Sequence, residues 1–246
     1  MKINKKFLFD NLITIFYALI IAIIIRSLLF QPFYIPSSSM EPTLLIGDRL
    51  FVSKYTYGYS KHSFPFSPSI SNNRFFFKRP KRGEVIVFKT PADNRTDYIK
   101  RLIGHPGDEI QFIDGNLYLN NNQILKTKKN IKGLKIFCGK NHMDVIAFDE
   151  KLPNGYSYTA VYSKENSFKN SDKYIVPKNH YFFLGDNRDC SKDSRYLHSV
   201  GYVNKLNLVG RARIIFFSTS KNEGNIFQIW KWFKIIQWNR FFDRIN

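Results

Sequence analysis

Residues 7–30 form a long apolar stretch near the N-terminus, and no other feature of the sequence restricts the fold as strongly. Its centre, residues 12–25, carries no charge, and Asp10 and Arg26 lie near its two ends, where their side chains can reach an interface. With a rise of about 1.5 Å per residue, the stretch is long enough to cross a hydrocarbon core of about 30 Å. The sequence therefore predicts one N-terminal transmembrane helix.

Two other structures are compatible with the composition of this stretch. The buried core helix of a soluble domain usually keeps a polar face, whereas residues 7–30 are apolar all round. A cleavable signal peptide shares the basic start formed by Lys2, Lys5 and Lys6, but it ends at a small-x-small site, and bulky, proline-bounded residues 31–36 follow here. We therefore expect an uncleaved anchor, with residues 1–6 in the cytoplasm and the rest of the chain outside it.

Short runs rich in β-branched and aromatic residues follow the anchor, bounded by Gly, Pro, Asn and Asp. Between two of the runs, Asp114-Gly115 predicts a tight hairpin turn. Such a pattern predicts a mainly β protein built on an antiparallel sheet. The runs are residues 49–54, 84–89, 98–103, 109–113, 116–119, 181–184 and 212–217.

Composition shifts divide the chain beyond the anchor. Residues 120–175 are polar and rich in Lys and Asn, with weak strand patterning, and they predict a β subdomain inserted between residues 31–119 and 176–220 of the main β domain. Residues 60–80, with three consecutive Phe residues at 75–77, fit either a surface loop or a basic and aromatic patch at the membrane interface. The aromatic and basic segment 221–246 fits either an interfacial segment or a packed C-terminal segment.

The charge balance is strongly basic, with 38 Lys and Arg against 19 Asp and Glu, a formal net charge of +19. A positive charge of this size is typical of proteins that bind nucleic acid or anionic lipid, and a Lys-rich coding bias can also produce it. The charge alone therefore does not identify a partner. The two cysteines, Cys138 and Cys190, are too few for a disulfide framework or a zinc site. We expect no metal and no cofactor, and one disulfide stays an open alternative.

Three consecutive serines, Ser37 to Ser39, lie between two prolines in the first loop after the anchor. A serine hydroxyl is a poor nucleophile until a neighbouring base takes its proton. None of the five histidines lies in a stretch that resembles a serine-protease histidine motif, but a lysine can serve as the base when burial makes its neutral form accessible. Lys100, in the apolar run 98–103, is the best candidate; an exposed lysine on a sheet edge is the alternative.

Five segments, in this order behind an apolar anchor, closely resemble bacterial type I signal peptidases, also called leader peptidases. They are the segment around Ser39, residues 47–54, residues 81–88, residues 97–101 leading to 104–108, and residues 185–195. The resemblance extends from the anchor to about Phe217. It implies a membrane-bound serine endopeptidase that removes N-terminal signal peptides from exported preproteins by cutting after small-x-small sites such as Ala-x-Ala.

Residue by residue, the resemblance implies that Ser39 is the nucleophile and Lys100 the general base. Ser37 matches the serine whose hydroxyl helps to form the oxyanion hole, with the Ser39 amide as the second donor. Ser191 matches the residue that hydrogen-bonds and orients the lysine.

The resemblance also implies supporting residues around this dyad. Asp193 and Arg195 match a polar pair that holds the site together. Residues matching two shallow pockets for small substrate side chains are Phe33, Ile35, Leu44, Tyr98 and Ile99. The sequence departs from the family at Ser38, where many members have glycine, and only one membrane span is evident although many relatives have two.

The implied location is the bacterial inner (plasma) membrane, crossed once, with the catalytic domain on the periplasmic or outer side. The implied partners are preprotein signal peptides, membrane lipid and, transiently, the protein export machinery, with no nucleic acid and a monomeric state. A specialised processing peptidase of the same superfamily, attached to conjugation or pilus assembly, stays an alternative. A self-cleaving repressor protease does not fit the anchor, and a basic membrane-tethered binding protein would leave the five segments unexplained.

Overall fold

A computed structural model of the chain describes residues 5–65, 67–68, 73–131, 135–139, 141–220 and 232–245. Residues 1–4 of the expected cytoplasmic end lie outside the described residues. So do residues 66 and 69–72 of the predicted loop or patch, and residues 221–231 of the predicted C-terminal segment, Trp230 among them.

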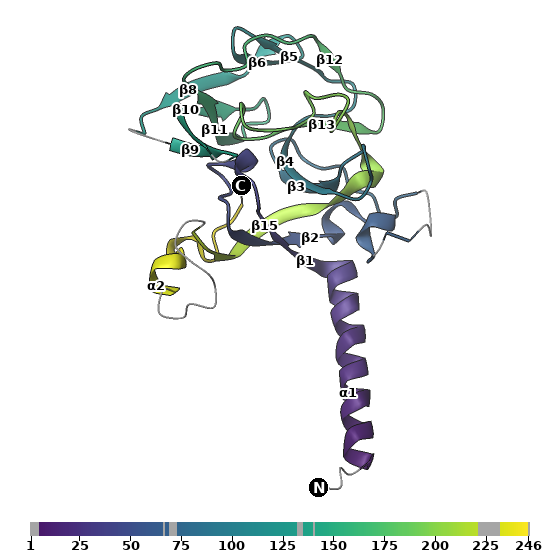
Figure 1. The fold of residues 1–246 in the computed structure, drawn as a ribbon. Helices are drawn as coiled ribbons and strands as arrows, with labels where there is room; N and C mark the ends of the chain where they lie inside the picture. The colour runs from purple at the N-terminus through teal and green to yellow at the C-terminus, as the bar shows by residue number, and fades with distance from the viewer. Residues whose placement is uncertain are drawn as a thin grey trace.

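The apolar N-terminal stretch folds into helix α1 (Lys5–Ile24), which continues as a π-helix over Ile25–Leu29. Residues Phe9–Leu29 have a mean hydropathy of 2.5, and only 6% of the apolar window is buried against the rest of the protein. The helix stands away from the β-rich body (Figure 1). An exposed apolar helix of this length satisfies its main-chain hydrogen bonds internally, as a segment in lipid must. The helix that the sequence predicts is therefore confirmed, and its composition fits a membrane anchor.

The main sheet has seven antiparallel strands in the order β1-β2-β15-β3-β4-β13-β14. Strand β1 contains Pro32, which cannot donate to a ladder, and it lies at the edge of the sheet, where such a residue is tolerated. The strands are β1 (Phe30–Tyr34), β2 (Asp48–Ser53), β3 (Val85–Lys89), β4 (Asp97–Gly104), β13 (His180–Leu184), β14 (Val203–Asn204) and β15 (Leu208–Ser218). The mainly β, antiparallel fold class is thus confirmed.

Two four-stranded sheets lie at the end of the body away from the anchor (Figure 1). Asp114 and Gly115 join β5 to β6 with φ values of 48° and 74°, as a tight primed turn requires. One sheet contains β12 (Tyr174–Ile175), β5 (Glu109–Ile113), β6 (Asn116–Leu119) and β7 (Asn122–Gln123). The other contains β11 (Ser157–Ser163), β10 (Asn141–Lys151) and β8 (Leu125–Lys129), with β9 (Lys135–Cys138) paired to β10. In the first sheet, β5 and β6 precede residue 120, whereas β7 and β12 belong to the predicted insertion 120–175. The sheet therefore crosses the predicted boundary at residue 120, and the division into domains stays a prediction.

Short helices complete the body. The 3-10 helices are Ser38–Met40, Tyr55–Tyr57, Lys61–Ser63, Lys205–Asn207 and Trp238–Arg240, and α2 is Trp232–Ile235. Near the C-terminus, Arg240 Nη2 lies 2.6 Å from Oδ2 of the buried Asp48, and the Phe242 amide donates to the Ile215 carbonyl. The described part of the C-terminal segment is therefore packed on the main sheet, while the side chains of Phe233, Trp238 and Phe242 remain exposed.

Candidate active site

Ser39 lies in the 3-10 turn Ser38–Met40, which the chain forms between β1 and β2. The turn is held from the other side by Asn187, whose main-chain amide donates to the Ser39 carbonyl (3.2 Å) and whose side-chain amide donates to the Ser38 carbonyl (3.2 Å). Segment 185–195 therefore packs directly on the serine loop. The close packing requires Gly185, because a Cβ there would lie 2.5 Å from the Ser39 carbonyl oxygen and 2.1 Å from Ser191 Oγ.

Lys100 reaches Ser39 from β4. It lies opposite Ile86 of β3 in the antiparallel register, which fixes the face on which its side chain emerges. Its side chain is 3% exposed, and its Nζ atom lies 2.7 Å from Ser39 Oγ and 2.8 Å from the Ile99 carbonyl oxygen. The predicted nucleophile and the predicted base are thus within hydrogen-bond distance, and the exposed-edge alternative for Lys100 is wrong.

Burial changes the acidity of the Lys100 ammonium. Desolvation lowers its pKa from 10.5 to about 8, although the carboxylates of Asp193 and Asp186 act in the opposite direction. At pH 7 roughly a tenth of such lysines would be neutral, against fewer than one in a thousand for a lysine in water. The side chain can therefore accept a proton near neutral pH.

Ser37 lies beside the dyad, with its Oγ 3.3 Å from Ser39 Oγ. Its side chain is exposed on the wall of a cavity that also includes Ser39 and Lys100. A hydroxyl in this position can donate to an oxygen that develops charge beside the nucleophile.

The polar pair predicted behind the dyad is formed. Arg195 donates to both oxygens of Asp193, at 2.8 Å from Nε and 2.9 Å from Nη2, and the Gly185 amide adds a third hydrogen bond of 3.0 Å. Burial alone would raise the pKa of Asp193, but the charge of Arg195 and the hydrogen bonds from Arg195 and Gly185 hold it below its ordinary value. Asp193 therefore stays ionised and supplies negative charge near Lys100.

Ser191 is buried next to this pair. No well-formed hydrogen bond to its hydroxyl exists among the described residues, and the hydrogen bonds of Lys100 go to Ser39 and Ile99. Its role in orienting the lysine stays a prediction.

A buried network that sequence reasoning missed ties the serine loop to β4. Arg101 donates from Nε and Nη2 to the two oxygens of Asp186 at 2.8 and 2.7 Å, and its Nη2 also donates to Thr43 Oγ1 at 3.2 Å. Thr43 Oγ1 in turn donates to Asp186 at 2.5 Å, and the Arg101 and Asp186 side chains are 1% and 0% exposed. Arg101 and Asp186 both lie in segments that carry the family resemblance, residues 97–101 and 185–195. They are 85 positions apart in the sequence, however, and no sequence pattern indicates that they form a pair.

The cavity beside Ser39 has a volume of about 420 Å³ and lies between β1, the serine loop and β4. Four of the five predicted substrate-pocket residues line it, namely Phe33, Ile35, Tyr98 and Ile99. The fifth, Leu44, is fully buried in the adjoining core and is not one of the residues that line this cavity. Sequence reasoning missed Val87, Cys190 and Lys192, which also contribute to the walls.

A disulfide joins Cys138 of β9 to Cys190, with sulfur atoms 2.04 Å apart. It connects the predicted insertion to the segment that carries Ser191, and the Cys190 sulfur lies 3.9 Å from Ser38 Oγ. The sequence left a single disulfide as one alternative, and the structure contains it. Over the described ranges, no three His, Cys, Asp or Glu residues come together as metal ligands would.

Comparison with known proteins places the chain in a family. A family profile described as signal peptidase, peptidase S26, matches residues 8–217. Signal peptidase I of Rickettsia typhi is 39% identical over 212 residues, covering 82% of this chain and 78% of the relative. Signal peptidase I of Rickettsia akari is 36% identical over 245 residues, covering 92% and 89%. A crystal structure of a signal peptidase I from Enterococcus faecalis is 26% identical and covers 55% of this chain and 97% of that one, with a TM-score of 0.33. The chain therefore belongs to the signal peptidase family, peptidase S26, which consists of serine endopeptidases.

Proposed function

We propose that this protein removes N-terminal signal peptides from exported preproteins, with Ser39 as the nucleophile and Lys100 as the general base. The observation that carries the proposal is the 2.7 Å separation between Ser39 Oγ and the Nζ atom of a buried lysine. A lysine in such surroundings exchanges its proton near neutral pH, which a lysine in water does not. Membership in the peptidase S26 family supports the substrate class.

In the first half of the reaction, neutral Lys100 accepts the hydroxyl proton of Ser39 while Oγ bonds to the carbonyl carbon of the scissile peptide. The resulting tetrahedral species carries its negative charge on the former carbonyl oxygen. When this species collapses, the C–N bond breaks, and Lys100 gives its proton to the leaving amine. The signal peptide then remains as an ester on Ser39.

In the second half, Lys100 is neutral again and takes a proton from a water molecule that attacks the ester. The acid released is the signal peptide, and the proton returns from Lys100 to Ser39 Oγ. The Ser37 hydroxyl and the Ser39 amide would stabilise the oxyanion in both halves, and losing one such donor typically costs about 10²–10³ in rate.

The apolar cavity beside the dyad supports a preference for small side chains before the cut. Phe33, Ile35, Tyr98 and Ile99 line a space that is open to the surface and whose walls are mainly apolar. We propose that alanine-sized side chains occupy it, as at Ala-x-Ala sites. The anchor would hold this cavity at the outer surface of the membrane, close to the end of a membrane-embedded signal peptide.

Peptide cleavage by the full chain in detergent tests the proposal. A peptide containing Ala-x-Ala should be cut after the second alanine, and Ser39→Ala and Lys100→Ala should each abolish cleavage. Lys128→Ala, which removes an exposed lysine on β8, is the matched control and should retain full activity. Undiminished cleavage by Lys100→Ala would refute the proposed base. A substrate preference for one dedicated pilin-like protein over general preproteins would favour a specialised peptidase.

A further inference from the structure

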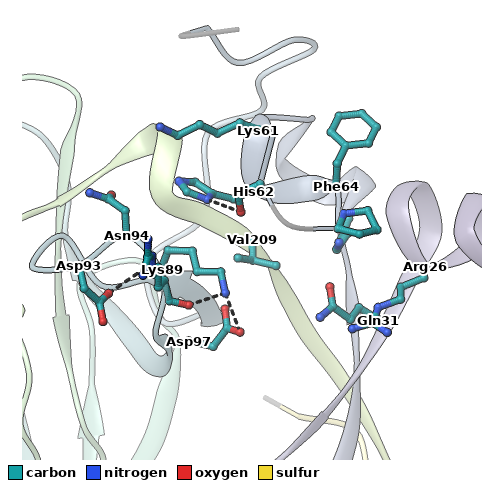
Figure 2. A pocket seen from close by; sticks show the side chains of 14 residues that line it. Arg26, Gln31, Lys61, His62, Phe64, Lys89, Asp93, Asn94, Asp97 and Val209 are labelled. Carbon is teal, nitrogen blue, oxygen red and sulfur yellow. Dashed lines mark hydrogen bonds and ion pairs between the residues drawn. The ribbon is translucent and has the colours of Figure 1, made fainter. Parts of the chain in front are cut away.

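A second cavity lies where the anchor joins the β body (Figure 2). Its volume is about 690 Å³, larger than that of the cavity beside Ser39. Arg26 of the π-helix and Gln31 of β1 form one wall, and the turn between β3 and β4 forms the opposite wall (Figure 2). Asp97, at the start of β4, lines this cavity and also the one beside Ser39, so the two cavities adjoin.

Positive charge exceeds negative charge around this cavity. The charged residues that line it are Arg26, Lys54, Lys61, Lys89 and Arg95, with Asp93 and Asp97. Both carboxylates are already engaged. Asp97 pairs with Lys89 at 2.9 Å, and Asp93 accepts hydrogen bonds from the amides of Arg95 and Thr96 within its own turn.

Four of the five cations form no ion pair with a carboxylate in the part of the chain that the structure describes. One is Arg95, in the turn between β3 and β4; the others are Arg26, at the end of the anchor, and Lys54 and Lys61, on the adjoining segment of the body. The positive field inside the cavity is therefore not neutralised by the protein. A cleft lined mainly by positive charge concentrates anions.

Two buried polar side chains in the wall also keep unused hydrogen-bonding capacity. Lys54 is 2% exposed, and its ammonium, which has three donors, makes one hydrogen bond of 2.5 Å to the Ser63 carbonyl. His62 is 4% exposed, and its Nδ1 shares a hydrogen bond with Ser67, but its buried Nε2 has no partner among the described residues. Buried polar groups of this kind are normally satisfied, so a polar ligand is the expected occupant.

Electrostatics at Lys54 agree with an anionic occupant. Burial, followed by repulsion from Arg26, lowers the pKa of Lys54 to about 8. A bound anion would offset both effects and keep the lysine charged.

Position identifies the source of the anion. Arg26 lies within the last turn of the apolar span Phe9–Leu29, so its guanidinium is at the depth where lipid phosphates meet the hydrocarbon. From this placement we infer that the cavity binds the phosphate of an anionic phospholipid headgroup between Arg26, Lys54 and Lys61. The bound lipid would fix the β body against the membrane surface next to the Ser39 cavity.

The test uses the full chain, purified in nonionic detergent and freed of lipid, with titrated phosphatidylglycerol or phosphatidylcholine and native mass spectrometry as the readout. The test variant is Arg26→Gln/Lys61→Gln. Each cation near an anionic lipid is worth roughly fivefold in affinity, so this variant should bind phosphatidylglycerol roughly thirtyfold more weakly. The matched control Lys128→Gln/Lys151→Gln removes two exposed lysines of β8 and β10, strands that do not line the cavity. It should bind phosphatidylglycerol as tightly as the wild type does.

Several outcomes would overturn the inference. Equal phosphatidylglycerol affinity in the test variant and the wild type would exclude the cavity, and an equal loss in the control variant would indicate nonspecific charge attraction. Full displacement of the lipid by millimolar inorganic phosphate would identify a free-phosphate site instead. Peptide cleavage in detergent without lipid should be the same in all these proteins, so a failure of the proposed protease activity would be seen separately.

Discussion

The rate of peptide cleavage should depend on pH through Lys100. The base must be neutral to accept the Ser39 proton, so activity should rise as pH increases through the pKa of the lysine in the free enzyme. Burial lowers this pKa to about 8, against the opposing charges of Asp193 and Asp186. The expected profile of kcat/KM is therefore an ascending limb centred near pH 8.

The size of the effect separates a buried lysine from an ordinary one. With a pKa near 8, the neutral fraction is about a tenth at pH 7 and about nine-tenths at pH 9, so kcat/KM should rise roughly tenfold and then level off. With the ordinary pKa of about 10.4, the rise over the same interval would be roughly a hundredfold, with no plateau before pH 10.

The assay is kcat/KM for an Ala-x-Ala peptide that has no group titrating between pH 6 and 10, measured on the detergent-solubilised chain at constant ionic strength. Single-turnover measurements confirm that chemistry, rather than product release, limits the rate. A flat profile, a descending one, or a rise that continues past pH 10 would each refute the assignment of a desolvated Lys100 as the base. Melting temperatures across the same range exclude pH-dependent unfolding as the cause.

Four further outcomes are expected. Lys100→Met should be inactive yet more stable than the wild type at pH 7, on the order of 1–3 kcal/mol, because it removes a buried charge. This difference in unfolding free energy should shrink as the pH rises from 8 to 10.5, because over that range Lys100 is deprotonated in the folded wild type but still protonated in the unfolded chain. Equal melting temperatures of the two proteins at pH 7 would contradict this. Ser37→Ala should lower kcat by about 10²–10³ with little change in KM, and a change under twofold would remove it from the oxyanion site. Replacing both Cys138 and Cys190 by serine should destabilise the fold by up to about 4 kcal/mol relative to the disulfide-bonded wild type, given a separation of 52 residues, as measured by thermal unfolding without reductant; equal stability of the two proteins would contradict this. Asp186→Asn should cost about 3–5 kcal/mol in the same assay, since it leaves the buried Arg101 without its carboxylate, and a neutral effect would count against the network.

Much of the fold follows from local patterns. The predicted run at residues 98–103 corresponds to β4 (Asp97–Gly104), and the runs at 109–113 and 116–119 match β5 and β6 together with their Asp114-Gly115 turn. These strands have apolar faces in the core, so their alternation is visible in the sequence. Two of the strands that were missed lack this signal. Strand β8 (Leu125–Lys129) is mostly exposed and rich in lysine, and β1 contains a proline that only an edge strand tolerates.

The sequence by itself determined the apolar anchor, the mainly β class and the family, because hydrophobic length, strand period and ordered motifs are local properties of the chain. It also named Ser39 and Lys100, but it could not say that they meet. That depends on the pairing of β4 with β3 and on segment 185–195 packing against the serine loop. Ser39 and Lys100 are 61 positions apart in the sequence, and this packing brings their side chains to 2.7 Å. The same packing removes the water that would otherwise keep the lysine charged. Only the tertiary structure decided the disulfide, the Arg101–Asp186 pair and the cationic cavity beside the anchor, because proximity and desolvation are properties of the folded chain.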